Sequence, residues 1–148
     1  MTTLHPGGCL CGKVRFEAAA EPLRIVHCHC VFCAGRPAVP WRPSRASNAL
    51  SKSPGLGAPR RSTRGAPAVY RSPAIRRSFC RARGSPLSCE SDGYRNEIYL
   101  VIGAFDEPDR LPPTAHVHVA QKISWFEFAN GLPRFAASAV GPATAGDL

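Results

Sequence analysis

The chain has 148 residues, 44% of them hydrophobic, which is enough for one domain with a buried core and no disulfide support. No apolar run is long enough for a transmembrane helix, and the first residues contain no apolar signal segment. These observations exclude a helical membrane protein and lead us to expect a cytoplasmic location. In a reducing cytoplasm, clustered cysteines bind metal more often than they form disulfides, and this chain has seven cysteines.

The formal net charge of +9 is concentrated in residues 34–66, which contain many Lys and Arg residues but no Asp or Glu. The rest of the chain is close to balanced, so the charge describes this segment rather than the whole fold. A nucleic-acid site needs aromatic side chains interleaved with its basic residues, and Trp41 is the only aromatic residue of the segment. We therefore expect neither nucleic acid nor a membrane as a partner.

The first third of the chain has the pattern of β-strands. Polar and apolar residues alternate over 13–17, which places Val14 and Phe16 on one face of a strand. A second strand is predicted over 23–30, where it leads into a compact group of cysteines. The following segment, 34–66, is dominated by Ala, Arg, Pro, Ser and Gly without a period of a strand or helix, and this composition predicts disorder.

Strand patterns return near Val69. They predict strands over 74–80, 86–90, 96–102 and 115–119, the last with clean alternation. No convincing amphipathic helix is predicted, so the expected fold class is all-β, formed mainly by antiparallel strands. We expect a single domain over 7–135 and a flexible tail over 136–148.

The first cysteine pair, Cys9 and Cys11, has a C-x-C spacing. Residues i and i+2 of a strand point to the same side, so both sulfur atoms can reach one metal ion. A tetrahedral zinc site needs two further ligands, and Cys80 is the candidate for the third. The alternative is a pair of buried free thiols that pack as small hydrophobic side chains.

The second cysteine group, Cys28-His-Cys-Val-Phe-Cys33, combines C-x-C with C-x-x-C. Three thiolates on one zinc ion leave a fourth coordination position, and such an open position distinguishes catalytic zinc from structural zinc. In a strand, His27 and His29 point to the face opposite Cys28 and Cys30. We therefore interpret the two histidines as ordinary polar strand residues rather than as ligands.

The cysteine groups lie within longer motifs: Gly7-Gly-Cys-Leu-Cys-Gly12, His27-Cys-His-Cys-Val-Phe-Cys33, and Arg77-Ser-Phe-Cys80 with Gly84-Ser-Pro-Leu87. Together these motifs resemble the glutathione-dependent formaldehyde-activating enzyme family, which includes the relatives of centromere protein V. The resemblance extends into the C-terminal half at Asp92, Glu97-Ile98, Gly103, Asp106-Glu-Pro108, Leu111-Pro112, His116, Lys122, Trp125 and Gly131-Leu-Pro133.

The resemblance implies a β-tent fold, in which small antiparallel sheets are stapled by zinc. It also implies two Zn²⁺ sites: a structural site at Cys9, Cys11 and Cys80, and a catalytic site at Cys28, Cys30 and Cys33. The implied partner is a small-molecule thiol such as glutathione. The implied reaction joins that thiol to formaldehyde and gives S-hydroxymethylglutathione, the activity of a carbon–sulfur lyase.

The chain departs from the family pattern after Cys80, where the family has a second cysteine in C-x-x-C spacing. This chain has Arg83 there, and a guanidinium stays protonated and cannot bind a metal. Cys89, His5 and a water molecule are the candidates for the missing fourth ligand. The structural site is therefore weakened, and the stability of the fold with it.

The second departure is the segment 34–66, which in the family continues into strands beside the substrate pocket. Here the length is right but the composition is not. One interpretation is a divergent loop, and the other is a stretch of coding sequence read out of frame, with the frame regained near Pro67. A disordered segment would leave the catalytic zinc without a complete pocket wall, so thiol–formaldehyde adducts would form little faster than in the uncatalysed reaction.

Three functional hypotheses follow. The first is a zinc enzyme of carbon–sulfur chemistry that uses Cys28, Cys30 and Cys33. The second is a zinc-stapled binding module without catalysis, and the third is a degenerate family member that is inactive. An enzyme needs an open zinc position that a thiol can reach, whereas a staple does not.

Overall fold

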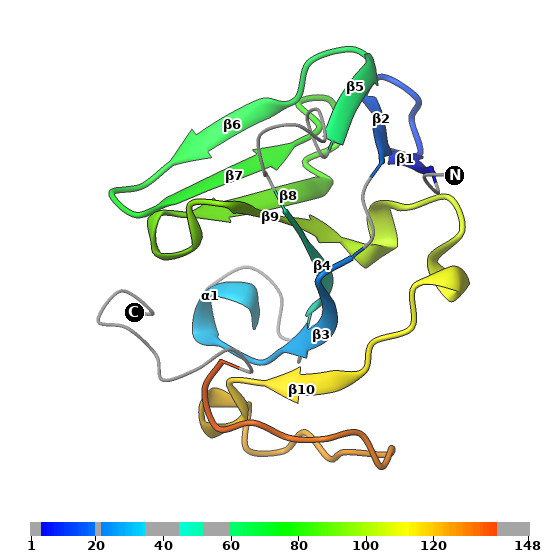
Figure 1. Ribbon diagram of the computed structural model, residues 1–148. Helices are drawn as coiled ribbons and strands as arrows, with labels where there is room; N and C mark the ends of the chain where they lie inside the picture. Colours follow the sequence, from blue (N-terminus) through cyan, green and yellow to red (C-terminus); the bar gives the residue numbers. More distant parts are fainter. Residues whose placement is uncertain (1–3, 20–21, 35–44, 52–59, 139–148) are drawn as a thin grey trace.

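Two β-sheets form the protein in the computed structural model, which describes residues 4–19, 22–34, 45–51 and 60–138 (Figure 1). One sheet has three strands in the order β1-β2-β5, and the other has seven in the order β10-β3-β4-β9-β8-β7-β6. The strands are β1 (His5–Gly8), β2 (Arg15–Ala18), β3 (Arg24–Cys28), β4 (Arg45–Ser51), β5 (Arg60–Arg64), β6 (Ala68–Arg71), β7 (Ile75–Phe79), β8 (Pro86–Ser91), β9 (Glu97–Val101) and β10 (Ala115–Val117). This architecture confirms the mainly β fold class.

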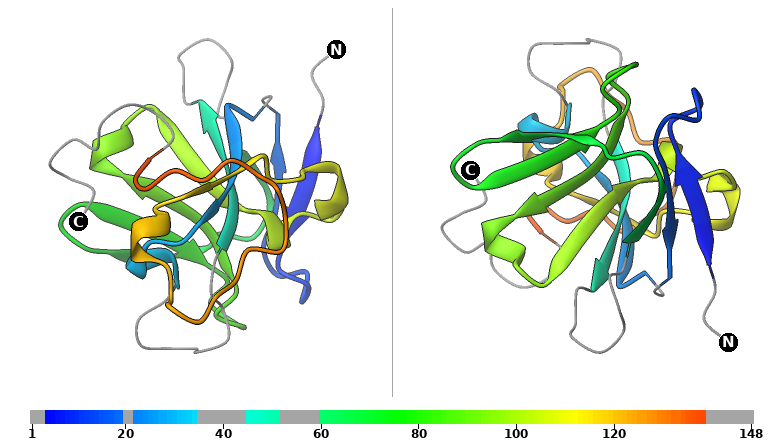
Figure 2. Two further views of the ribbon diagram at one scale, coloured as in Figure 1. Left: turned by 90° about the horizontal axis from the view of Figure 1, so that it is seen from below. Right: turned by 90° about the horizontal axis from the view of Figure 1, so that it is seen from above.

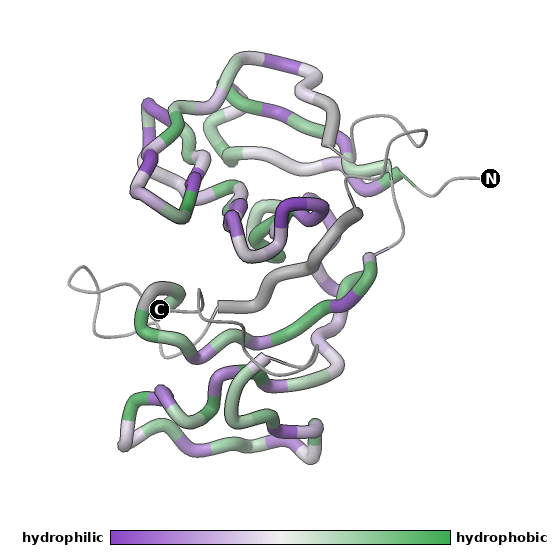
Figure 3. Tube along the Cα trace, turned by 60° about the vertical axis from the view of Figure 1, so that its left-hand side comes forward, coloured by the Kyte–Doolittle hydropathy of each residue, from purple (hydrophilic) through white to green (hydrophobic). Residues whose placement is uncertain are grey.

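Helical structure in the described residues is limited to single turns. These are α1 (Val31–Ala34) and the 3₁₀ turns η1 (Asp92–Tyr94), η2 (Ile102–Ala104), η3 (Pro108–Arg110) and η4 (Val119–Gln121). Hydrophobic and hydrophilic residues are interspersed along the described chain (Figure 3), and no helix there is long and apolar enough to span a membrane.

Alternating hydrophobicity explains why the early strands form where the sequence predicted them. Val14 and Phe16 are both buried, with 4% and 1% of their surfaces exposed. Phe16 packs edge-to-face against Phe105, with ring centroids 5.4 Å apart. Strand β2 thus directs one face into the main core, while its backbone pairs with β1 on one side and β5 on the other.

The sequence predicted a strand over 115–119 in which polar and apolar side chains alternate between two faces, and this prediction is wrong. Only Ala115–Val117 form a strand, and all three residues are buried. On one face of β10, Ala115 and Val117 pack with Val26 and Cys28, and on the other face His116 packs against aromatic rings. The edges of β10 are paired as well, with β3 in parallel on one side and with the C-terminal segment on the other (Figure 2). A strand buried on both faces has no exposed polar side.

The segment 34–66 was expected to be without strands, and the structure corrects this for two stretches. Strand β4 lies between β3 and β9, and β5 completes the three-stranded sheet. Both stretches lack Pro and Gly, so every residue in them can donate to and accept from a neighbouring strand. Residues 35–44 and 52–59 lie outside the described residues, as do residues 139–148 of the predicted tail.

The buried hydrophobic side chains form two clusters. The larger lies between the sheets and includes Phe16, Leu87, Leu100 and Phe105, together with Cys9 and Cys80. The smaller consists of Val26, Cys28, Ala115 and Val117, with Cys30 and Cys33 packed against it. Each core cluster therefore supports one group of cysteines.

Candidate metal centres

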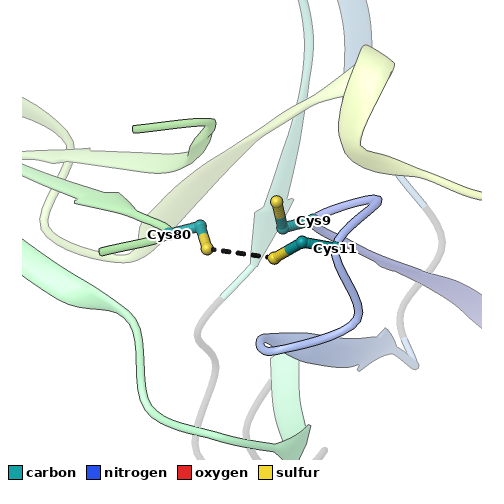
Figure 4. A group of neighbouring side chains, drawn as sticks. All are labelled: Cys9, Cys11 and Cys80. Atoms are coloured by element: carbon teal, nitrogen blue, oxygen red, sulfur yellow. Dashed lines mark hydrogen bonds between the residues drawn. The ribbon is translucent and has the colours of Figure 1, made fainter. Parts of the chain in front are cut away.

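The first cysteine group brings together two hairpin loops from different sheets. Cys9 and Cys11 lie in the loop between β1 and β2, and Cys80 begins the loop between β7 and β8 (Figure 4). The three Sγ atoms lie within 4.8 Å of one another, and those of Cys11 and Cys80 are 3.6 Å apart. This geometry brings Cys80 to the pair, as the sequence predicted, and the three sulfur atoms could hold one metal ion.

Ser85 is a member of this site that sequence reasoning missed. Its Oγ lies 3.4 Å from Cys9 Sγ, and its carbonyl oxygen accepts a hydrogen bond from Cys80 N–H. The Ser85 hydroxyl, followed by the backbone N–H of Cys11, lowers the pKa of the Cys9 thiol to about 7. The thiolate form that a metal requires is therefore favoured at Cys9. The Lys13 backbone N–H acts in the same direction on Cys11, but the hydrogen bond with Cys9 and burial outweigh it and raise the pKa of the Cys11 thiol.

The fourth ligand proposed for this site does not come from Cys89 or His5. Within the part of the chain that the structure describes, the group of potential donor atoms contains Cys9, Cys11 and Cys80 alone. Cys89 lies on β8, opposite Arg77 of β7 and Tyr99 of β9, because the strand continues straight rather than folding back. His5 packs edge-to-face against Phe105.

The second cysteine group is local. Cys28 ends β3, Cys30 follows it, and Cys33 lies in α1. The three Sγ atoms again lie within 4.8 Å of one another, and those of Cys28 and Cys30 are 3.3 Å apart. The turn of α1 closes the group, since Cys33 N–H donates to both the carbonyl oxygen and the sulfur of Cys30.

Hydrogen bonds within this second group distribute the protons unequally. Those from the Cys28 and Cys33 thiols hold the pKa of the Cys30 thiol far below its ordinary value. The hydrogen bonds of Cys28 with Cys30 and Cys33, together with burial, raise the pKa of the Cys28 thiol. Without a metal, the group therefore favours one thiolate, at Cys30, held by two thiols.

Two basic residues from other elements lie near this group. Arg77 of β7 interacts electrostatically with Cys33, and His118 interacts with Cys30. His118 follows β10 and has a left-handed backbone conformation with φ 55°, which is uncommon outside glycine. Arg77 was noted in the sequence only as part of the motif that contains Cys80, and neither residue was assigned to this group. A strand pairing between β10 and β3 is needed to bring His118 beside Cys30.

His27 and His29 are not ordinary polar strand residues. His29 is completely buried, its Nε2 lies 2.9 Å from Nδ1 of His116, and the rings of His27 and His116 stack. The ring of His29 also packs against those of Phe126 and Phe128. Among the described residues, neither His27 nor His29 belongs to the two cysteine groups, and that they are not ligands stays a prediction.

The donor set of each group suits a thiophilic metal. Thiolate sulfur is a preferred ligand of zinc, and none of the seven cysteines, all of which lie in described parts of the chain, forms a disulfide. Three close sulfur atoms satisfy three positions of a tetrahedral ion. Both groups therefore fit a zinc ion with one remaining coordination position.

Comparisons with known proteins agree with these motifs. The family model described as glutathione-dependent formaldehyde-activating enzyme matches residues 4–121. A crystal structure of a protein from Rhodobacter sphaeroides is similar in fold, with a TM-score of 0.51 and 22% sequence identity over 68% of this chain and 87% of that chain. No curated protein gives a significant match.

Proposed function

Because the chain belongs to the glutathione-dependent formaldehyde-activating enzyme family, we propose that it uses zinc at Cys28, Cys30 and Cys33 to join a small thiol to an aldehyde. The observation that carries this proposal is the compact group of three sulfur atoms within 4.8 Å of one another. Glutathione and formaldehyde are the proposed substrates, and S-hydroxymethylglutathione is the proposed product. The proposed location is the cytoplasm, where glutathione and reduced cysteines coexist.

The proposed reaction is an addition that needs no oxidant or reductant. The thiol sulfur forms a bond to the carbonyl carbon, the carbon–oxygen double bond becomes single, and the thiol proton is transferred to the oxygen. Zinc would supply Lewis acidity and would favour the ionised form of a thiol at its open position. The reverse reaction breaks the same carbon–sulfur bond, which is the lyase activity.

The residues of this chain would fix the position of the site. Strand β3 carries Cys28, and the α1 turn returns Cys33 to the same point. Val31 N–H, at the start of that turn, donates to the side chain of Gln121 at 3.1 Å. Such contacts hold the cysteines before substrate arrives, and preorganisation of this kind lowers the entropic cost of a reaction between two substrates.

Arg77 would balance the charge of the loaded site. Three thiolates exceed the charge of one zinc ion by one negative unit, and a bound substrate thiolate adds another. Arg77 is half-buried on β7 and interacts electrostatically with Cys33. A fixed cation at this place favours the anionic state in which the thiol reacts.

The test compares the wild-type chain with a variant that carries Cys28→Ser, Cys30→Ser and Cys33→Ser. Cys89→Ser is the matched control, because Cys89 lies outside both cysteine groups. We expect the triple variant to lose one equivalent of zinc by elemental analysis. We also expect it to lose the acceleration of adduct formation, followed by NMR with glutathione and formaldehyde, whereas the control keeps both.

Equal zinc content in the wild type and the triple variant would refute the metal assignment. Zinc loss without any acceleration in the wild type would instead support a zinc-stapled module or an inactive family member. One observation supports these two alternatives. At the site of Cys9, Cys11 and Cys80, Arg83 occupies the position where the family has a fourth cysteine.

A further inference from the structure

The loops that carry the first cysteine group have similar turns. Gly12 N–H donates to Cys9 C=O at 2.9 Å, and Gly84 N–H donates to Cys80 C=O at 2.7 Å. Both glycines have left-handed backbones, with φ 72° and 67°. Each turn is closed by hydrogen bonds to the carbonyl oxygen of its first residue, a cysteine. The first turn contains a second cysteine, Cys11, and the second turn contains none. In the described part of the chain, this group therefore offers a metal ion three protein donors.

The groups nearest to the fourth position are unsuited to fill it. Arg83 N–H donates to Cys80 C=O at 3.2 Å, which places Arg83 in the turn, but its guanidinium has no lone pair for a metal. The Ser85 hydroxyl hydrogen-bonds Cys9 Sγ at 3.4 Å. A neutral hydroxyl in this role supports a thiolate and does not replace one.

The site lies close to the protein surface. Leu10, between the two cysteines of the first loop, is fully exposed, and Cys11 is half-buried. A Cβ atom added at Gly12 or at Gly84 would have no neighbour within 4 Å. Cys9 and Cys80 are 3% and 1% exposed, so a small molecule would approach the site from the side of Cys11.

The surrounding charges favour an anionic ligand. Lys13, Arg81 and Arg83 are exposed in the two loops, and no ion pair between them and an acidic side chain is found among the described residues. A zinc ion with three thiolates carries one net negative charge, and a fourth thiolate would add a second. The three cations reduce the cost of that added charge.

We propose that Cys9, Cys11 and Cys80 form a second open zinc site, which takes a small exogenous thiol as its fourth ligand. Binding exchanges water for the thiol sulfur, and the thiol proton leaves to solvent. The site is separate from Cys28, Cys30 and Cys33, and its ligand exchange does not depend on the reaction proposed for that group. Its open position results from Arg83 and is expected to close when a cysteine is restored there.

The experiment isolates this site in the variant that carries Cys28→Ser, Cys30→Ser and Cys33→Ser. Cobalt(II) replaces zinc as the probe, because its visible spectrum reports the number of coordinating thiolates. We expect one equivalent of cobalt to bind, and we expect added 2-mercaptoethanol to increase the sulfur-to-cobalt charge-transfer band in a saturable way. The full chain loaded with cobalt is measured in parallel, in case the triple variant folds poorly.

Two substitutions at one position separate ligation from charge. Arg83→Cys supplies the fourth thiolate from the protein, so the thiol-dependent change is expected to be lost, and the melting temperature of the zinc-loaded protein is expected to rise. Arg83→Ser removes the same cation without adding a ligand, so the thiol-dependent change remains. In the full chain, both cysteine groups contribute to the thiol-dependent change of the charge-transfer band. Subtracting the change seen with Arg83→Cys from the change seen with the wild type gives the contribution of this site.

Either of two results would overturn the proposal. One is a cobalt spectrum of the isolated site that does not change with thiol, which would show that the protein itself closes the site. The other is an Arg83→Cys variant that responds to thiol as the wild type does. Absence of cobalt from the triple variant, when circular dichroism shows it to be folded, would also refute the site.

Discussion

At the scale of single residues, a chain of hydrogen bonds that starts in the core and ends at the surface connects the second cysteine group to the C-terminal segment. His116 Nε2 lies 2.9 Å from Asn130 Oδ1, and that same oxygen accepts from Leu132 N–H. Because an amide oxygen only accepts, His116 carries its proton on Nε2. Its Nδ1 must then accept from His29 Nε2–H at 2.9 Å. His116 thus holds the residue between Cys28 and Cys30 in place.

We predict that His116→Ala lowers the free energy of unfolding by about 3 kcal/mol, since it removes a buried ring and leaves the His29 Nε2–H donor without an acceptor. Asn130→Ala is the control, because Asn130 is exposed and water can replace it; we expect a loss of about 1 kcal/mol. Urea denaturation monitored by circular dichroism measures both. Equal losses would contradict this direction of the hydrogen-bond chain.

The same residues show what the sequence could predict of the site. Cys28, Cys30 and Cys33 are neighbours along the chain, so their spacing alone predicted their convergence. Ser85 and His116 were not predicted as partners of Cys9 and His29, because these contacts join residues 76 and 87 positions apart. No local period encodes such a contact; it depends on how strands pair.

At the scale of elements, the alternation of polar and apolar residues predicted the strands that have one face in the core. It did not predict the strands that form only because neighbouring strands pair with them. Strand β2 follows its pattern, with Phe16 buried. Strands β4 and β5 have no such pattern, and yet each pairs with strands that do. Backbone hydrogen bonds do not depend on side-chain type, so a polar stretch without Pro or Gly can be recruited by its neighbours.

The packing of β5 can be tested at the glycine that follows it. Gly65 has φ 60°, and a Cβ atom there would lie 2.0 Å from the carbonyl oxygen of Lys13, next to β2. We predict that Gly65→Ala costs about 3 kcal/mol of stability, from the left-handed backbone and the clash together. Gly12→Ala has a similar φ of 72° but open space, and should cost only about 1 kcal/mol.

Urea denaturation of both variants, at equal zinc content, measures this difference. A similar cost for Gly65→Ala and Gly12→Ala would show that β5 does not pack against the start of β2. The comparison therefore tests β5, a strand in the segment 34–66 that the sequence predicted to be disordered.

At the scale of the whole molecule, the two cysteine groups connect the chain differently. Cys11 and Cys80 are 69 positions apart, and their loops belong to different sheets. Cys28 and Cys30 are two positions apart and lie at the end of a single strand. A zinc ion at the first group would close a long loop and join the two sheets, whereas one at the second group would fix only a local turn.

This difference predicts unequal effects on stability. A cross-link that closes a long loop removes more conformational entropy from the unfolded chain than a local one does. We expect Cys80→Ser to lower the free energy of unfolding of the zinc-loaded protein by about 4 kcal/mol, and Cys30→Ser by about 1 kcal/mol. Chemical denaturation with zinc in slight excess measures both losses.

Repeating the denaturation in excess chelator separates the contribution of the metal from that of packing. Cys80 is almost completely buried, so replacing its sulfur by a hydroxyl has a cost of its own that persists without metal. Only the part of the loss that disappears in chelator belongs to zinc, and we expect this to be most of it. If Cys80→Ser lowers stability equally with and without chelator, the two sheets are held together by their shared core and not by a metal ion.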